Sequence, residues 1–202
     1  MTKKIKDFSM KDIIFATGNA HKADELRKVI KNVNILTLKD INLKCDIIED
    51  GKTFHDNALI KCKTIYDLTG KPVIADDSGL SVDQLGGDPG VFSARYGKPE
   101  FDDKQRYEHL LKNLDPNKPM DASFICCLIL YLTPGRIYSV QEEVRGVITT
   151  TPRGENGFGY DPIFYIPSLN KTYAELSNDE KNAISHRGKA VQVMNGIIQS
   201  VL

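Results

Sequence analysis

The feature of the sequence that most constrains the fold is the stretch 71–80, in which three apolar residues lead directly into two carboxylates. The run Val73–Ala75 follows a glycine and a proline and is typical of a short strand buried on both faces. In open α/β sheets the edge at which such strands end is where ligands bind. We therefore expect a strand that ends at Asp76 and Asp77, with both carboxylates at the rim of a sheet.

Two adjacent carboxylates repel each other, so a cation, a bound proton or solvent must relieve them. The same four residues, Asp76, Asp77, Ser78 and Gly79, also have the composition of a solvated turn. From this stretch alone, a functional site and an ordinary turn both remain open.

Apolar runs and helical patterns alternate along most of the chain. Strands are expected at 13–17, 34–38, 46–49 and 73–75, and helices at 20–30, 53–68, 101–114 and from Ser177 to the C-terminus with an interruption at 185–188. Residues 122–133 and 136–150 flank Pro134-Gly135 and predict a long hairpin. This order predicts a three-layer α/β fold with a mixed sheet.

Composition limits the class of protein. The 202 residues include 27 Lys plus Arg and 27 Asp plus Glu, so no overall basic field favours a nucleic-acid partner. The longest apolar run, 124–132, is too short to cross a bilayer. Residues 1–11 form a polar lead-in without a secretory signal. The four cysteines are interpreted as free buried thiols in a reducing compartment, so we expect a soluble cytoplasmic protein: Cys45, Cys62, Cys126 and Cys127.

The turn between the first strand and the first helix has the features of a phosphate site. A helix N-terminus presents unpaired N–H groups and a positive dipole end. Gly18 allows close approach to the backbone, and Lys22 adds a full charge. The alternative is that Asn19 only caps the helix while Lys22 is solvated.

Three sets of polar residues are the candidates for a site. Those that suit anionic oxygen are Thr17, Gly18, Asn19, Lys22 and Lys61. Those that offer hard oxygen ligands are Glu49, Asp76 and Asp77. Those that offer stacking and hydrogen-bond donors are Phe158, Tyr160, His186 and Arg187. The alternatives are a wet helix surface for Asn57 and Lys61, and a place in the core for Phe158 or Tyr160.

Hard carboxylates without an accompanying His/Cys set select Mg²⁺ or Mn²⁺ over zinc. Magnesium is usually held by one or two carboxylates together with substrate phosphates. With an anion-binding turn for phosphates and aromatic residues for a base, a nucleoside triphosphate is the expected ligand. The expected reaction is attack by activated water on a phosphorus.

Six ordered motifs, from about residue 13 to the C-terminus, resemble the inosine triphosphate pyrophosphatase family, whose bacterial members are called XTP/dITP diphosphatases. They are Thr17-Gly-Asn-x-x-Lys22, Phe54-x-x-Asn57-Ala-x-x-Lys61, Ala75-Asp-Asp-Ser-Gly-Leu80, Pro89-Gly-x-x-Ser-Ala-Arg-Tyr96, Gly157-Phe-Gly-Tyr-Asp-Pro162 and Lys181-x-Ala-x-Ser-His-Arg-Gly188. Two departures are Asp56, where the family usually has Glu, and Val144-Arg145, where many members carry Trp-Pro.

The resemblance implies one catalytic domain over 12–202, with an elongated sheet, two lobes and a central cleft, assembled as a homodimer. It implies Mg²⁺-dependent hydrolysis of ITP, dITP and XTP to the monophosphate and pyrophosphate. A related enzyme that prefers modified pyrimidines and a non-catalytic nucleotide sensor are the competing hypotheses.

The resemblance also implies residue roles. Asp77 is the expected general base and metal ligand, with Glu49 as a second metal contact. The phosphates are expected to meet the turn formed by Thr17, Gly18, Asn19, Ala20, His21 and Lys22. Ser78 is expected to touch substrate. The base is expected to be held by Phe158, Gly159, Tyr160, Asp161, Lys181, His186 and Arg187.

Overall fold

The computed structural model describes residue 9 and residues 11–202, so most of the predicted lead-in lies outside the described residues. The described chain divides into two compact units. Unit 1 comprises the described residues up to Asp77, with Cys127–Gln141 and Ala190–Leu202. Unit 2 comprises Ser78–Cys126 and Glu142–Lys189.

The strands form one sheet in the order β2-β1-β3-β4-β5-β6-β7. They are β1 Asp12–Phe15, β2 Asn34–Thr37, β3 Val73–Val82, β4 Asp121–Thr133, β5 Arg136–Ile148, β6 Phe164–Ile166 and β7 Lys171–Thr172. The α-helices are α1 Ala20–Val29, α2 Phe54–Thr69, α3 Asp103–Lys112, α4 Asn178–Ile184 and α5 His186–Val201.

The sheet is mixed, as predicted. Strand β1 runs parallel to β2 and β3, with Ile14 opposite Leu36 and Val73. Strands β5, β6 and β7 pair antiparallel. Neighbouring strands β4 and β5 are separated only by Pro134 and Gly135, which confirms the long hairpin because such a short connection joins antiparallel strands.

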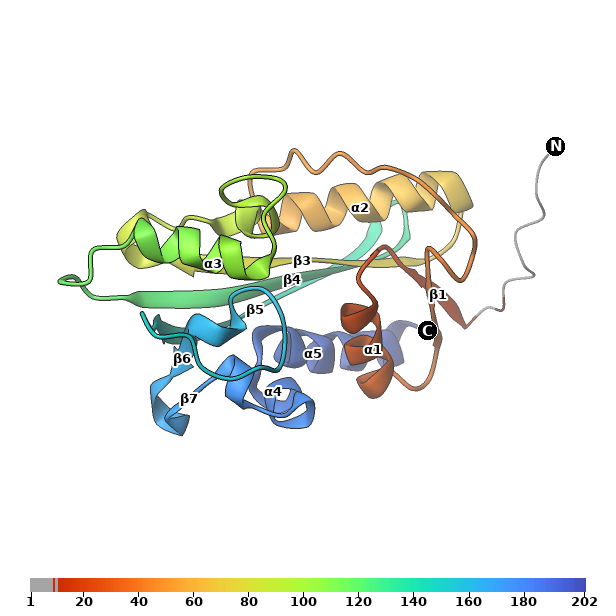
Figure 1. Cartoon of the computed structure of the whole chain (residues 1–202). Coiled ribbons are helices and arrows are strands. Elements are labelled where there is room, and N and C mark those ends of the chain that lie inside the picture. The colour runs from red at the N-terminus through yellow and green to blue at the C-terminus, as the bar shows by residue number, and fades with distance from the viewer. Residues whose placement is uncertain (1–8, 10) are drawn as a thin grey trace. The chain divides into compact units, whose positions relative to one another are not determined.

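In unit 1, helix α2 covers one face of the strands while α1 lies on the opposite face (Figure 1). Helix α2 begins where the sequence predicts, because Thr53 and Asp56 form a reciprocal capping box. It ends at Thr69 and is capped by Gly70, whose φ of 63° suits a residue without a side chain. The position of α1 and α2 on opposite faces of the strands confirms a layered arrangement in unit 1 (Figure 1).

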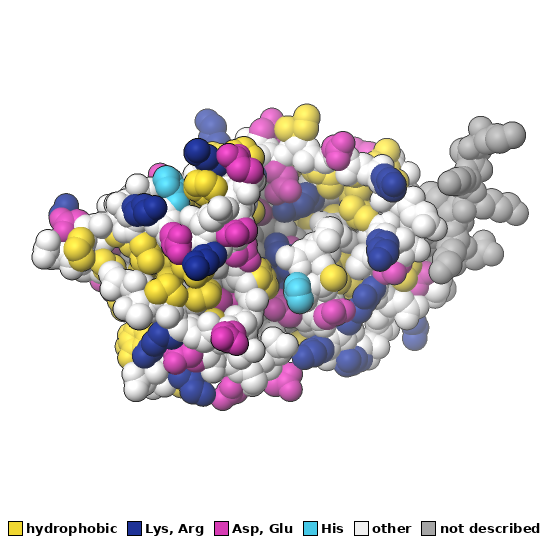
Figure 2. All heavy atoms as spheres, in the orientation of Figure 1, with side chains coloured by type: hydrophobic (Ala, Val, Ile, Leu, Met, Phe, Trp, Pro, Cys, Tyr) yellow, Lys and Arg dark blue, Asp and Glu magenta, His cyan; other side chains and the backbone are white. Residues whose placement is uncertain are grey.

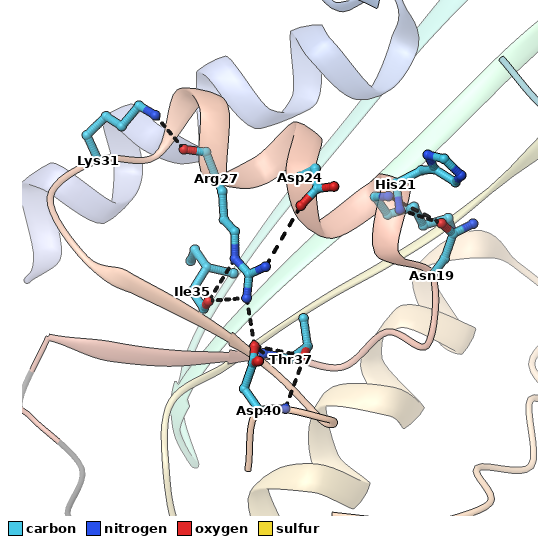
Figure 3. Close-up of polar contacts among 9 residues, drawn as sticks. Asn19, His21, Asp24, Arg27, Lys31, Ile35, Thr37 and Asp40 are labelled. Carbon is cyan, nitrogen blue, oxygen red and sulfur yellow. Dashed lines mark hydrogen bonds and ion pairs between the residues drawn. The ribbon is translucent and has the colours of Figure 1, made fainter. Parts of the chain in front are cut away.

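Helix α1 is fastened to the strand that follows it by one arginine (Figure 3). The Nε and Nη2 atoms of Arg27 donate to the Ile35 carbonyl at 3.1 and 3.0 Å. Nη2 also donates to Asp40 at 2.7 Å. The backbone hydrogen bond from Thr37 is the main cause that lowers the pKa of Asp40, and Arg27 adds to it. The turn after β2 is thereby held against the helix.

The core of unit 2 is rich in aromatic rings. Phe124 on β4 stacks on Tyr173 with ring centroids 5.6 Å apart, and Phe164 meets Phe124 edge to face at 4.7 Å. Tyr160 belongs to the same buried cluster. Helix α3 lies on one side of the strands of unit 2, and α4 lies on the other (Figure 1).

Two local predictions are wrong. Residues 46–49 form no strand: residues 43–51 have no regular secondary structure, and Ile48 is 77% exposed. The end of this segment is held by helix α2 instead of by a strand, because Glu49 pairs with Lys61 and the Gly51 N–H donates to the Asn57 side chain. Cys45 is only partly buried, whereas Cys62, Cys126 and Cys127 are buried, and all four are free thiols.

The surface matches the balanced composition. Positive and negative side chains are interspersed over the face drawn in Figure 2. Among the described residues, no helix is both long enough and apolar enough to cross a membrane.

A close backbone approach in unit 2 generates a stability prediction. A Cβ added at Gly79 would lie 2.3 Å from Ser93 Oγ and 2.5 Å from the Gly90 carbonyl. Gly79→Ala should therefore lower the free energy of unfolding by about 1–3 kcal/mol, as overpacking does. Denaturant unfolding measures the change.

The matched control is Gly196→Ala in helix α5, where an added Cβ meets no described atom within 4 Å. This change should raise the free energy of unfolding by about 0.5–1 kcal/mol because alanine loses less backbone entropy. Equal effects of the two substitutions would contradict the packing argument.

Candidate functional site

Strand β3 does not end at the two carboxylates. It continues through them to Val82, so Asp76 and Asp77 lie in mid-strand and not at a rim or in a solvated turn. Their exposed fractions are 2% and 8%. Both the predicted strand end and the turn alternative are therefore wrong. A buried strand tolerates these charges only if each has a partner.

Each carboxylate has its own lysine. Successive strand residues point to opposite faces of a sheet. Asp76 meets Lys22 of α1 at 2.9 Å. Asp77 meets Lys61 of α2 at 3.4 Å. Helices α1 and α2 lie on opposite faces (Figure 1), which explains how neighbouring anions acquire separate cations.

We define the acidic cluster as Glu49, Asn57, Lys61 and Asp77, all in unit 1. The Lys61 ammonium lies 2.8 Å from Glu49 and 3.4 Å from Asp77. Asn57 donates its side-chain amide to Asp77 at 3.1 Å. The cluster therefore brings together the two residues predicted to hold a metal.

Burial and charge shift the pKa values in this cluster. Burial raises the pKa of Asp77, although Lys61 and Asn57 oppose the shift. For Lys61, burial lowers the pKa, but the carboxylates of Asp77, Asp76 and Glu49 outweigh burial and leave the pKa above its ordinary value. The lysine therefore stays charged, and Asp77 is more basic than an ordinary aspartate.

The alternative of a wet helix surface for Asn57 and Lys61 is wrong, because both side chains are buried. The buried positions of α2 recur every three or four residues: Phe54, Asn57, Ala58, Lys61, Cys62 and Ile65. The two polar residues thus continue the apolar stripe of the helix. This spacing would have revealed Asn57 as a buried member of the site.

The turn before α1 is partly occupied by its own side chains (Figure 3). Asn19 Oδ1 accepts from the N–H groups of His21 and Lys22, so the capping alternative holds for Asn19. Thr17 Oγ1 accepts from Asn19 N–H at 3.1 Å. Lys22 is ion-paired and not simply solvated. A Cβ added at Gly18 would meet no described atom within 4 Å, so the turn leaves open space there.

We define the basic-aromatic cluster as Phe158, Asp161, Lys181 and Arg187, all in unit 2. Lys181 pairs with Asp161 at 2.5 Å and lies 4.8 Å from the centroid of the Phe158 ring. The Arg187 guanidinium lies 5.8 Å from that centroid and donates to Ser78 Oγ at 2.8 Å. Five predicted substrate contacts therefore gather in unit 2.

Burial raises the pKa of the Asp161 carboxyl, against the opposing effects of Lys181 and the Phe158 N–H. Gly157 has a φ of 80°, and a Cβ there would overlap the carboxylate of Asp161. The loop therefore needs glycine at this position.

The remaining predicted contacts of unit 2 are placed differently. His186 begins α5 and stacks on Phe124 with centroids 4.8 Å apart. Tyr160 is part of the core, and its hydroxyl donates to the Ser93 carbonyl at 3.0 Å, so the core alternative holds for Tyr160. Gly159 N–H donates to Asp103 of α3 at 2.7 Å, a contact that sequence reasoning missed.

The acidic cluster fits a hard divalent cation in its donor chemistry. Two carboxylates already converge on one positive charge, the ammonium of Lys61. Among the described residues no group of three His, Cys, Asp or Glu side chains could hold a metal by itself. Such an ion would therefore need further oxygens from a substrate, which is the usual way magnesium is bound.

Fold and side chains together define an α/β protein with a layered mixed sheet and two largely buried polar clusters, one acidic and one basic-aromatic. The sequence profile of the Ham1 family matches residues 13–196, and the chain belongs to that family.

Curated relatives extend over nearly the whole chain. A dITP/XTP pyrophosphatase of Staphylococcus epidermidis is 42% identical over 190 residues, which are 94% of this chain and 97% of that protein. A dITP/XTP pyrophosphatase of Bacillus licheniformis is 45% identical over 193 residues, covering 94% and 98%.

Solved structures agree with the fold. The Ham1 protein of Staphylococcus aureus has a TM-score of 0.87 at 35% identity, covering 94% of this chain and 99% of that chain. A HAM1 protein from Coxiella burnetii has a TM-score of 0.88 at 37% identity, with the same coverage.

The buried pair in unit 2 generates the second prediction. Lys181→Met leaves Asp161 buried without its cation and should lower the free energy of unfolding by about 3–5 kcal/mol at neutral pH. The carboxyl of the variant has a folded pKa above its unfolded value. The loss is therefore full above the folded pKa and disappears as pH falls below the unfolded value near about 4.

Denaturant unfolding across pH tests this prediction. The double variant Lys181→Met/Asp161→Asn should recover most of the lost stability because no charge remains to be buried. A loss that is independent of pH, or a double variant no more stable than Lys181→Met, would contradict the ion-pair argument.

Proposed function

We propose that this chain hydrolyses dITP, XTP and ITP to the nucleoside monophosphate and pyrophosphate. The observation that carries the proposal is the match to relatives named dITP/XTP pyrophosphatase along nearly the full length of both chains. The acidic cluster supports it, because it combines a buried carboxylate, a charged lysine and hard oxygen ligands. The homodimer and the cytoplasmic location stay predictions.

The proposed reaction is attack of water on the α-phosphorus. The water oxygen bonds to phosphorus, the bond from that phosphorus to the bridging oxygen breaks, and pyrophosphate leaves. Asp77 accepts the proton of the water, and its raised pKa brings it closer to the basicity that a general base needs. Lys22 and Lys61 supply positive charge to the phosphates.

Glu49 and Asp77 are the residues that we propose to hold magnesium. The chemistry that a bound Mg²⁺ supplies is neutralisation of phosphate charge and polarisation of a phosphoryl oxygen. The protein's own side chains supply two further functions. Asp77 takes the proton, and Lys61 keeps the two carboxylates together.

Unit 2 is proposed to recognise the base. Hypoxanthine and xanthine carry a 6-oxo acceptor, whereas adenine carries a 6-amino donor. Arg187 and His186 carry donors that pair with an oxo group and oppose an amino group. A buried site of this kind discriminates by up to ~10⁴-fold because the wrong base leaves polar groups unpaired. Phe158, which already faces Lys181 and Arg187, offers a flat surface for stacking.

A substrate panel tests the function. Pyrophosphate release is measured from dITP, XTP, ITP, ATP, GTP and dUTP, with and without magnesium. We expect magnesium-dependent release that is fastest with dITP and XTP. Preference for dUTP would replace the proposal by a pyrimidine pyrophosphatase, and binding of dITP without turnover would replace it by a nucleotide sensor.

The role of Asp77 gives the third prediction. Asp77→Asn should reduce turnover of dITP by at least about 10²-fold, because it removes the base, while nucleotide affinity stays within about tenfold. The control is Asp83→Asn, which changes an exposed carboxylate just beyond the same strand. Steady-state kinetics and equilibrium binding provide the two measurements, and a fully active Asp77→Asn enzyme would refute the role.

The role of Arg187 gives the fourth prediction. Arg187→Ala should reduce the preference for ITP over ATP, measured as the ratio of kcat/KM values, by about tenfold or more, because it removes a donor to the 6-oxo group. Arg145→Ala is the control, since Arg145 pairs with Asp83 at the surface of the same unit. If both variants keep the wild-type preference, Arg187 does not recognise the base.

A further inference from the structure

Both the amide nitrogen and the amide oxygen of the Asn57 side chain form hydrogen bonds. It lies in the first turn of α2 and is fully buried. Its Nδ2 donates to Asp77 Oδ2 at 3.1 Å, and its Oδ1 accepts from Gly51 N–H at 2.8 Å. A buried amide is costly unless it is hydrogen-bonded, and here both ends are satisfied.

The orientation of this amide follows from its partners. A backbone N–H can only donate, so the atom that faces Gly51 must be the amide oxygen. The nitrogen then faces Asp77 and requires an acceptor, which an ionised carboxylate supplies. Asn57 is therefore oriented as a donor to Asp77.

Gly51 connects the same amide to Glu49. Gly51 lies two residues after Glu49, in a segment without regular secondary structure. A Cβ added at Gly51 would lie 2.6 Å from Asn57 Oδ1, so the backbone packs directly against the amide. Lys61, one turn further along α2, contacts the Glu49 carboxylate at 2.8 Å. Helix α2 thus holds the Glu49 segment at two successive turns.

We propose that Asn57 is a positioning residue that sets the placement of Glu49 relative to Asp77. The inference rests on the proposed function, which makes these two carboxylates the metal ligands and Asp77 the base. Asn57 acts through Asp77 and through the backbone at Gly51. Loss of an outer hydrogen bond to a metal ligand typically costs about 10–100-fold in metal affinity or activity.

Asn57→Asp tests the link to Asp77. It keeps the shape and the oxygen that faces Gly51, but it replaces the donor by an anion beside Asp77. For dITP we expect kcat to fall by about 10–100-fold while KM stays within about threefold. Asn34→Asp is the matched control, because Asn34 donates its amide to Asp12 at 2.8 Å elsewhere in unit 1. If kcat of Asn57→Asp equals that of the control, the proposal is overturned.

Two further measurements do not depend on activity. Hydrogen exchange of the Gly51 amide, measured by NMR, should be slow in the wild type and in Asn57→Asp. It should be fast in Asn57→Leu, which removes the oxygen that accepts from the Gly51 N–H. The double variant Asn57→Asp/Asp77→Asn reverses the hydrogen bond and should recover the Tm lost in Asn57→Asp, without restoring turnover.

These outcomes separate the two proposals. If the wild type does not hydrolyse dITP, the proposed function fails. Hydrogen exchange at Gly51 and recovery of Tm still decide whether Asn57 holds the Gly51 backbone and Asp77. Fast exchange of Gly51 in the wild type, or no recovery in the double variant, overturns the positioning role.

Discussion

Two neighbouring carboxylates buried inside a strand require two cations, and the arrangement of unit 1 follows from that requirement. Isolated buried charges cost several kcal/mol each, so Asp76 and Asp77 are compatible with folding only because lysines reach them. The alternation of side chains along β3 sends the two carboxylates to opposite faces. Lys22 from α1 and Lys61 from α2 then complete separate pairs. The helices that flank β3 are therefore electrostatic partners of the strand as well as hydrophobic covers.

The placement of most helices and strands was predictable because it depends on local chemistry. The cap of α2 at Thr53, the cap of α1 at Asn19 and the hairpin at Pro134-Gly135 each depend on residues a few positions apart. The length of β3 was not predictable in this way. Asp76 and Asp77 favour a turn locally, and only lysines distant in the sequence make a strand possible there. Tertiary pairing overrides local propensity in such cases.

In the candidate site, too, some features can be predicted from the sequence, whereas others depend on tertiary packing. Charged residues such as Glu49 and Lys181 stand out by residue type, and the structure pairs them with Lys61 and Asp161 respectively. Phe158 and Tyr160 cannot be distinguished by sequence, since both are aromatic residues next to glycine. The structure separates them: Phe158 faces two cations, whereas Tyr160 is buried in the core. The direction in which each ring points is a property of packing.

The capping box of α2 determines where unit 1 tolerates the insertion or deletion of residues. Successive helical residues are separated by about 100° of rotation. Thr53 and Asp56 determine which residue is the first of the helix and therefore the direction in which Asn57 and Lys61 project. One residue gained or lost between the cap and Asn57 would rotate the amide and the ammonium out of register with the strand. Glu49 and Gly51 are themselves held by Lys61 and Asn57. Residues 43–48, which come before these contacts and have no regular secondary structure, are not set by the rotation of the helix, so variation in length belongs there.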